Sequence, residues 1–424
     1  MLATAQRAST LHVVSRRAMS TEISCAARGG TFHILMNRPT ALNALNLAMI
    51  RDLSAGYAAA VADPSIHCVL LEGAGGKAFC AGGDVKGIWE AARAGAPITT
   101  ADVSDNFFRE EYVLNAAIAS CPKPQISVWG KKPRILLATL VTYLIVFLMS
   151  FAMPSLCADG IVMGGGVGVS VHGTYRLTSE RAMFAMPETN IGLFPDVGGS
   201  FFLSRLPGEI GTYVGLTGER LYAADLLYCG LATHYIPSEA LPDLKTRLEA
   251  CTGRPDVDSV LAELKASPTA ANASQGSGLE ANRAKIDAAF RYDTMEDIFA
   301  HLQREADQED AFSAKTLKTM QRMSPTSMKV TLRLLREARA QSGAAPLSAC
   351  LQREFRAVQR CVSVPSDFFE GIRAALVDKD RNPKWQPAAL EDVSAASVDE
   401  YFADLGEREW TTPPCLPPGF ERVP

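Results

Sequence analysis

The residues most able to do chemistry lie between Met163 and Ser200, where bare backbone and two isolated carboxylates occur together. Three consecutive glycines, Gly164–Gly166, leave their amide N–H groups without side-chain cover, so a ligand can approach them closely. Glu188 and Asp196 follow, each directly after a proline and each between apolar residues. Accessible amides beside carboxylates are the groups needed to polarise a carbonyl and to move protons around it.

A second glycine-rich segment, AFCAGGD at Ala78–Asp84, precedes this stretch. The overlapping segment Gly73–Ala78 fits the pattern G-x-G-x-x-A, which after a strand can indicate a dinucleotide site. We reject that interpretation because Phe79–Gly83 stands where a helix should begin, and no acidic residue ends a following strand at the right distance. The helix is instead expected to begin at Asp84, a good N-cap residue, and to run to Ala94.

Together the two segments resemble the crotonase (enoyl-CoA hydratase/isomerase) superfamily. The sequence PETNIGLFPDVGG, residues 187–199, is most similar to the 3-hydroxyisobutyryl-CoA hydrolase branch of that superfamily. The resemblance extends from Ile23 to Leu405, apart from one insertion. It implies an α/β fold, a spiral of strand–strand–helix repeats, with a mainly helical C-terminal region.

The resemblance also implies that the N–H groups of Gly83 and Gly165 form an oxyanion hole. A thioester carbonyl gains negative charge when it is attacked, and two fixed amides in a dry site stabilise that charge. In the hydrolase branch the second glutamate of the motif F-F-R-E-E-Y contacts the substrate, which gives Glu111 a substrate-binding role. The glycines could alternatively do no more than make tight turns, and Glu111 taken by itself reads as a solvated helix residue.

The acid–base residues separate the reactions of the superfamily. Its hydratases resemble one another in holding a water between two glutamates, one three residues after the oxyanion-hole glycine and one at the position of Glu188. Here the first position is Gly168, so hydration lacks one partner. Hydrolysis can use Glu188 as nucleophile or general base, with Asp196 orienting it or holding water or the substrate's hydroxyl. Asp196 is also a candidate N-cap for a helix beginning at Val197.

Three functions compete on this basis. The first is hydrolysis of a short 3-hydroxyacyl-CoA thioester, above all 3-hydroxyisobutyryl-CoA in valine breakdown. The second is hydration or isomerisation of an enoyl-CoA. The third is a non-catalytic protein on a crotonase scaffold. The expected partner is an acyl-CoA substrate, which itself brings the CoA, so no separate cofactor is expected.

Composition narrows the class of protein. Of 424 residues, 47% are apolar and 21% charged, which is ordinary for a globular protein, and the net charge of −4 gives no reason to expect a nucleic-acid partner. Ten cysteines without C-x-x-C spacing indicate reduced thiols. Six dispersed histidines form no H-x-x-x-H motif, so no metal site is expected. A homo-oligomer remains an open alternative.

The N-terminal segment 1–21 contains Arg7, Arg16 and Arg17, several hydroxyl residues, and no acid before Glu22. This pattern is typical of a mitochondrial transit peptide, which predicts a protein of the mitochondrial matrix. The alternative is a disordered tail.

Apolar periodicity predicts strands and helices in the order that the fold requires. A crotonase-like core is expected at 22–252, a helical C-terminal region at 253–410 and a loose tail at 411–424. The expected strands are Thr31–Met36, His67–Leu71, Pro124–Trp129, Tyr175–Ser179 and Ala182–Ala185. The expected helices include Leu45–Val61, Phe107–Ser120, Pro207–Leu216 and Ala223–Tyr228.

One segment, residues 130–158, interrupts the expected core. It separates the strand that ends at Trp129 from the triple glycine, and residues 135–153 within it are 19 consecutive uncharged residues, long enough for a transmembrane helix. The segment can be a membrane anchor, an additional buried helix, or a piece absent from the working protein, such as a translated intron. A single span would place the two halves of one core on opposite sides of a membrane, so a membrane partner is expected only if residues 135–153 are a genuine span.

Overall fold

The computed structural model describes residues 20–93, 103–130, 160–266, 277–340, 346–363 and 365–410. The predicted tail, nearly all of the predicted transit peptide (1–21), and the residues from 131 to 159 lie outside these ranges. Within them no helix is both long and apolar enough to cross a bilayer.

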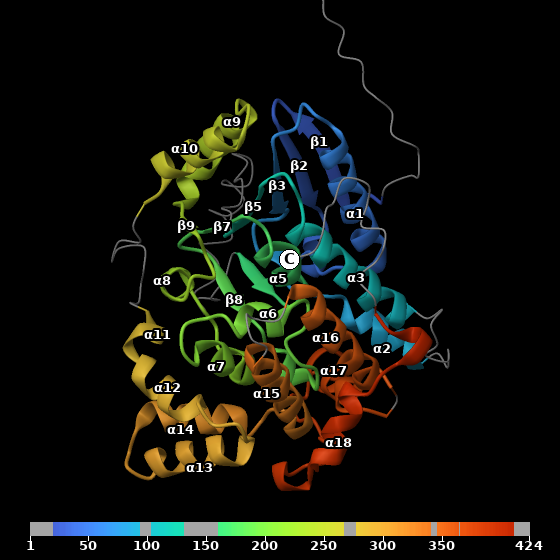
Figure 1. Cartoon of the computed structure of the whole chain (residues 1–424), viewed down its shortest axis with the longest axis vertical. Coiled ribbons are helices and arrows are strands. Elements are labelled where there is room, and N and C mark those ends of the chain that lie inside the picture. The colour runs from blue at the N-terminus through green and yellow to red at the C-terminus, as the bar shows by residue number, and fades with distance from the viewer. Residues whose placement is uncertain are drawn as a thin grey trace, which may run out of the picture.

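Two sheets form the centre of the molecule (Figure 1). The larger has the order β1-β2-β3-β5-β7-β9; its first pair is antiparallel and the others are parallel. The smaller is parallel, in the order β4-β6-β8. The strands are β1 Ile23–Arg28, β2 Thr31–Met36, β3 Cys68–Gly73, β4 Ala78–Cys80, β5 Gln125–Trp129, β6 Ile161–Met163, β7 Tyr175–Thr178, β8 Met183–Ala185 and β9 His234–Tyr235.

The same unit repeats three times. Each of β3, β5 and β7 lies in the larger sheet and is followed by a strand of the smaller one, β4, β6 or β8. A helix or helical turn then follows, and it leads to the next repeat. The predicted spiral of strand–strand–helix repeats is therefore confirmed.

Helices enclose these sheets and make up most of the second half of the chain (Figure 1). The first half contributes α1 Leu47–Ala62, α2 Val85–Arg93, α3 Val103–Ala119 and α5 Gly165–Val171. The 3₁₀ turn η2 Glu188–Ile191 and the helices α6 Gly199–Leu203, α7 Ile210–Thr217, α8 Ala223–Tyr228, α9 Leu241–Glu249 and α10 Arg254–Leu264 follow. The C-terminal region holds α11 Gly278–Ala281, α12 Arg283–Phe290, α13 Met295–Ala306, α14 Ala311–Met320, α15 Pro325–Ala340, α16 Leu347–Cys361, α17 Asp367–Ile372 and α18 Ala395–Asp399.

The glycines set two helix starts, one of which differs from the prediction. Helix α5 begins at Gly165, directly after Gly164 with its φ of +46°. Asp196 does not cap a helix at Val197: α6 begins at Gly199, and Gly198 occupies its N-cap with a φ of +82°. In both cases a glycine adopts a left-handed conformation that side-chain-bearing residues avoid, and this sets where the helix starts.

The helical C-terminal region packs directly on the strand core. Helix α16 contacts α3 and α6, and α17 contacts η2. The ring of Phe355 on α16 lies edge-on to that of Tyr112 on α3, with 6.3 Å between centroids. Buried apolar residues of both regions belong to one hydrophobic cluster, so the C-terminal helices complete the core.

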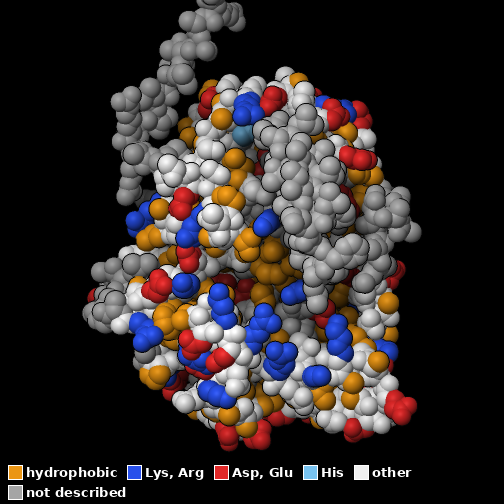
Figure 2. All heavy atoms as spheres, turned by 180° about the vertical axis from the view of Figure 1, so that it is seen from behind, with side chains coloured by type: hydrophobic (Ala, Val, Ile, Leu, Met, Phe, Trp, Pro, Cys, Tyr) orange, Lys and Arg blue, Asp and Glu red, His pale blue; other side chains and the backbone are white. Residues whose placement is uncertain are grey.

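The surface carries charges of both signs. On the face shown in Figure 2, Lys and Arg side chains are interspersed with Asp and Glu. This agrees with the small net charge of −4.

Candidate active site

The backbone N–H groups of Gly83 and Gly165 lie side by side. A Cβ built on Gly165 would be 3.3 Å from the Gly83 nitrogen. Gly165 is the first residue of α5, and the first amides of a helix have no partner within it. Neither amide donates a hydrogen bond to another described residue. Both donors predicted for the oxyanion hole are therefore adjacent and available.

Leu45 holds the Gly83 amide in this position. Its N–H donates to the Gly82 carbonyl at 2.8 Å, and its carbonyl accepts from the Asp84 amide at 2.7 Å. These two hydrogen bonds fix the residues on either side of Gly83. The Gly83 N–H is left out of the bridge and remains free to face a ligand.

Glu111, on α3, lies against the same glycines. The side chain is 2% exposed, and a Cβ on Gly165 would be only 2.4 Å from its Oε1, which has no hydrogen-bond partner among the described residues. Burial raises its pKa well above the usual value, and the charge of Asp196 raises it further. The alternative of a solvated helix residue is wrong for Glu111.

Glu188 begins η2 and lies against Gly164, the first of the three glycines. A Cβ on Gly164 would be 3.0 Å from its Oε1, and its Oε2 has no partner within the described residues. The side chain is 5% exposed, and burial followed by the charge of Asp196 raises its pKa well above the usual value. A buried carboxyl with an unoccupied oxygen can accept a proton or attack a carbon.

Asp196 is the third buried carboxyl of the candidate site, after Glu111 and Glu188, and is 4% exposed. Its Oδ2 accepts a hydrogen bond of 2.9 Å from the hydroxyl of Tyr112, the residue next to Glu111 on α3. Burial raises the pKa of Asp196 to about 7, while the hydrogen bond from Tyr112 acts in the opposite direction. Asp196 can therefore exchange a proton near neutral pH.

The loop that carries Asp196 is strained and is held from two sides. Val197 has a φ of +54°, which is unfavourable for a β-branched residue. Its carbonyl lies 2.8 Å from Nε2 of His172; because a carbonyl only accepts, Nε2 carries the proton. From α16, Glu354 Oε2 accepts from the Gly198 amide at 2.7 Å, and Oε1 accepts from the amide and hydroxyl of Ser200 at 2.8 and 2.6 Å.

Sequence reasoning missed Glu354, Tyr112 and the role of His172. Glu354 is 154 residues after Ser200, in a region where no motif singles it out. The only local signal for Tyr112 was its place at the end of the motif that contains Glu111. For all three residues the role becomes apparent only from contacts made in the fold.

Gly168 has no space for a side chain. Its Cβ would lie 2.6 Å from Cβ of Val197 and 2.9 Å from Nδ2 of Asn115. The position that carries a glutamate in the hydratases is thus filled here by neighbouring side chains.

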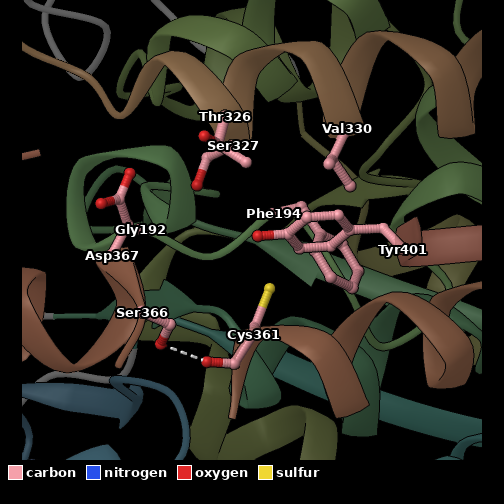
Figure 3. A pocket seen from close by; sticks show the side chains of 9 residues that line it. All are labelled: Gly192, Phe194, Thr326, Ser327, Val330, Cys361, Ser366, Asp367 and Tyr401. Atoms are coloured by element: carbon pink, nitrogen blue, oxygen red, sulfur yellow. Dashed lines mark hydrogen bonds between the residues drawn. The ribbon is translucent and has the colours of Figure 1, made fainter. Parts of the chain in front are cut away.

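A small cavity lies behind the loop that leads to Asp196. Phe194, Cys361, Asp367 and Tyr401 are among the residues that line it, as Figure 3 shows. Its volume of about 10 Å³ holds roughly one water. It is too small for an acyl group, and none of the predicted site residues lines it, so it is distinct from the site around Gly165.

Comparisons with known proteins agree with this geometry. A family model described as enoyl-CoA hydratase/isomerase matches residues 31–130 and 143–402. The interruption falls inside the segment 130–158, and the match resumes before that segment ends.

Among curated relatives, the mitochondrial 3-hydroxyisobutyryl-CoA hydrolase of Rattus norvegicus is 39% identical over 93% of this chain and 92% of its own. The Xenopus laevis protein of the same name is 41% identical, covering 89% of this chain and 87% of its own. A probable 3-hydroxyisobutyryl-CoA hydrolase of Arabidopsis thaliana is 42% identical, covering 89% and 90%.

Solved structures of similar fold carry other names. A carnitinyl-CoA dehydratase from Mycobacterium thermoresistibile is 32% identical with a TM-score of 0.76, covering 93% of this chain and 99% of its own. An enoyl-CoA hydratase from Rhodobacter sphaeroides is 31% identical with the same TM-score, covering 92% and 100%. Fold, paired glycine amides and family match agree, and the chain belongs to the enoyl-CoA hydratase/isomerase, or crotonase, family.

Proposed function

We propose that this protein hydrolyses a short 3-hydroxyacyl-CoA thioester, 3-hydroxyisobutyryl-CoA above all, and that it does so in mitochondria. The names of the curated relatives support both the substrate and the location. The structural observation that carries the proposal is the packed position 168: without a carboxylate there, Glu188 and Asp196 are left as the acid–base pair. The acid-free, arginine-bearing start of the sequence further supports import into the matrix.

The geometry supports a direct mechanism. The thioester oxygen would accept from the N–H groups of Gly83 and Gly165, which stabilise the charge that forms on attack. Glu188 either attacks the thioester carbon, forming an acyl-enzyme that water then hydrolyses, or removes a proton from an attacking water. The bond to sulfur breaks in either case. Asp196, with a pKa of about 7, is suited to give a proton to the departing thiolate.

Thiol release measures this activity directly. Purified protein is mixed with 3-hydroxyisobutyryl-CoA, and free CoA is followed with a thiol reagent. Catalytic release supports the proposal; its absence in folded protein rejects it.

Enoyl-CoA hydration is the second candidate, because two solved structures of similar fold are named for a dehydratase and a hydratase. It predicts loss of enoyl absorbance without thiol release. The missing carboxylate at Gly168 argues against it, since water addition then lacks its second glutamate.

We expect Tyr112→Phe to make hydrolysis less sensitive to alkaline pH. The Tyr112 hydroxyl stabilises the ionised form of Asp196, so its removal raises the pKa of Asp196. The proposed mechanism needs protonated Asp196 as proton donor, so the alkaline limb of the pH profile moves to higher pH: relative to its activity at pH 6, the variant keeps more activity at pH 8.5 than the parent does. A complete pH profile of kcat/KM checks this. A uniform loss at every pH would mean that Tyr112 only supports the packing.

We expect Glu354→Gln to lower both stability and kcat. An amide nitrogen placed against the Gly198 or Ser200 amide sets donor against donor, so at least one buried N–H loses its hydrogen bond, which lowers the free energy of unfolding by about 1–3 kcal/mol. Urea unfolding measures the first effect. Because the loop also carries Asp196, kcat should fall more than KM rises. Glu305→Gln, which removes a surface ion-pair partner, should change stability by less than about 0.5 kcal/mol.

A further inference from the structure

Asn115 is a buried polar side chain without a partner, next to the candidate site. Its exposure is 0%, and neither Oδ1 nor Nδ2 has a hydrogen-bond partner among the described residues. A buried amide left in this state costs roughly 1–3 kcal/mol per unpaired group, so it is normally explained by a ligand or a water. Glu111 and Glu188 each carry an unpaired oxygen in the same part of the molecule.

The position of Asn115 relative to the oxyanion hole follows from two adjacent helices. Glu111 and Asn115 are four residues apart on α3 and share one face of it; Gly165 and Gly168 are three apart on α5 and likewise share a face. Glu111 lies against Gly165 and Asn115 lies against Gly168, with Nδ2 2.9 Å from the Cβ position. Asn115 therefore lies beside a residue of α5 that is three positions after Gly165. Three residues span roughly 4.5 Å along the axis of α5.

A short 3-hydroxyacyl group is long enough to bridge a separation of this size. In a 3-hydroxyacyl thioester three bonds join the thioester carbon to the hydroxyl oxygen, a span of about 4 Å at ordinary bond lengths. A hydroxyl donates one hydrogen bond and accepts others, and a carboxamide offers one acceptor and one donor group. Asp196 is less suited to this task, because its Oδ2 already accepts from Tyr112.

We propose that Asn115 binds the 3-hydroxyl of the acyl group and so selects hydroxylated substrates. The proposal rests on the proposed hydrolase function and adds the residue that recognises the hydroxyl. The absence of a side chain at Gly168 gives Asn115 its position. A site built to hydrogen-bond a hydroxyl discriminates strongly against the analogue that lacks it, because its own polar groups then stay unpaired.

Paired substrates test this in the full-length chain. We expect Asn115→Leu to lower kcat/KM for 3-hydroxyisobutyryl-CoA by ~10-fold or more. Its kcat/KM for isobutyryl-CoA, which differs only in lacking the hydroxyl, should stay within about twofold, because the leucine removes only the hydrogen-bonding groups. Equal losses for both substrates, or no loss for either, would overturn the proposal.

Two further variants control for folding. Asn115→Ala removes the amide without adding apolar bulk and decides the question if the leucine variant fails to fold. Thr331→Val removes another buried, unpartnered polar atom, on α15, and should leave the ratio between the two substrates unchanged. A changed ratio in Thr331→Val would count against a specific role for Asn115.

Binding separates this proposal from the hydrolase function itself. In a Glu188→Gln background, which retains the pocket, we expect the hydroxylated acyl-CoA to bind more tightly than isobutyryl-CoA. Adding Asn115→Leu should abolish that difference. Hydroxyl-dependent binding without thiol release in the parent protein would reject the hydrolase and retain Asn115. If the parent protein releases thiol but Asn115→Leu does not change the binding difference between the two acyl-CoA compounds, the hydrolase function is retained and the role of Asn115 is rejected.

Discussion

Glu188→Gln is expected to lower thioester hydrolysis by ~10²–10⁴-fold, the typical cost of losing a positioned acid–base group. The loss is larger still if Glu188 is a covalent nucleophile. Glutamine nearly keeps the shape of glutamate, but it neither attacks carbon nor accepts the proton. Binding of the acyl-CoA should persist, because the amides of Gly83 and Gly165 are untouched.

Release of thiol from 3-hydroxyisobutyryl-CoA measures the rate, and titration with the same compound measures binding. Glu110→Gln is the matched control, because Glu110 is beside Glu111 in the sequence but pairs with Arg51 at the surface. It should keep near-normal turnover. Near-normal turnover in Glu188→Gln would remove Glu188 from the mechanism and, with it, the main chemical reason for proposing a hydrolase.

Deleting Gly130–Ala158 is expected to give a more soluble, more stable and more active protein. The structure places the described residues Gly130 and Gly160 together: a Cβ on Gly160 would be 2.4 Å from Cα of Gly130. In the other two repeats four residues join the strand of the larger sheet to that of the smaller sheet: 74–77 between β3 and β4, and 179–182 between β7 and β8. Between β5 and β6 there are 31 residues, 130–160. The extra chain is thus not needed to connect the strands.

The benefit of the deletion would come from the apolar sequence. Closing a longer loop costs little, about 0.6 kcal/mol per doubling of its length. A 19-residue uncharged segment, by contrast, exposes an apolar patch that favours aggregation if it does not pack. Soluble yield, thermal unfolding and thiol release of the two chains provide the comparison.

A second deletion makes this test sharper. Deleting Gly130–Ala158 places Asp159 at the position of Gly130, where a Cβ would lie 2.3 Å from Oγ of Ser179. Removing residues 131–159 instead joins Gly130 directly to Gly160 and keeps both glycines, whose φ values are +96° and +105°. If the full-length chain is as soluble and as active as both deletions, the segment belongs to the working protein.

Much of the fold was predictable because local pattern and tertiary role coincide. The strand Thr31–Met36 and the helix Ala223–Tyr228 match their predicted limits, since apolar periodicity and bounding turn residues define both. The glycines Gly83 and Gly165 were predictable for a similar reason: the approach of two backbones requires residues without side chains.

The remainder of the site depends on long-range contacts. Nothing near Glu354 indicates that it accepts from Gly198, 156 residues earlier. Asn115 looks like an ordinary helical residue until α3 is placed against α5. The strained φ of Val197 likewise persists because His172 and Glu354 hold the loop around it, and local propensity alone disfavours it.

The bracing of the loop that carries Asp196 by Glu354 of α16 has a consequence for the order in which the protein becomes functional during synthesis. All five groups assigned to the site precede residue 200, and chains generally fold from the N-terminus as they leave the ribosome. Yet Glu354, which holds the loop of Asp196, and Phe355, which packs on Tyr112, are encoded more than 150 residues later. A nascent chain that already contains every reactive group therefore still lacks the contacts that align them, and the enzyme becomes competent only after α16 has been made.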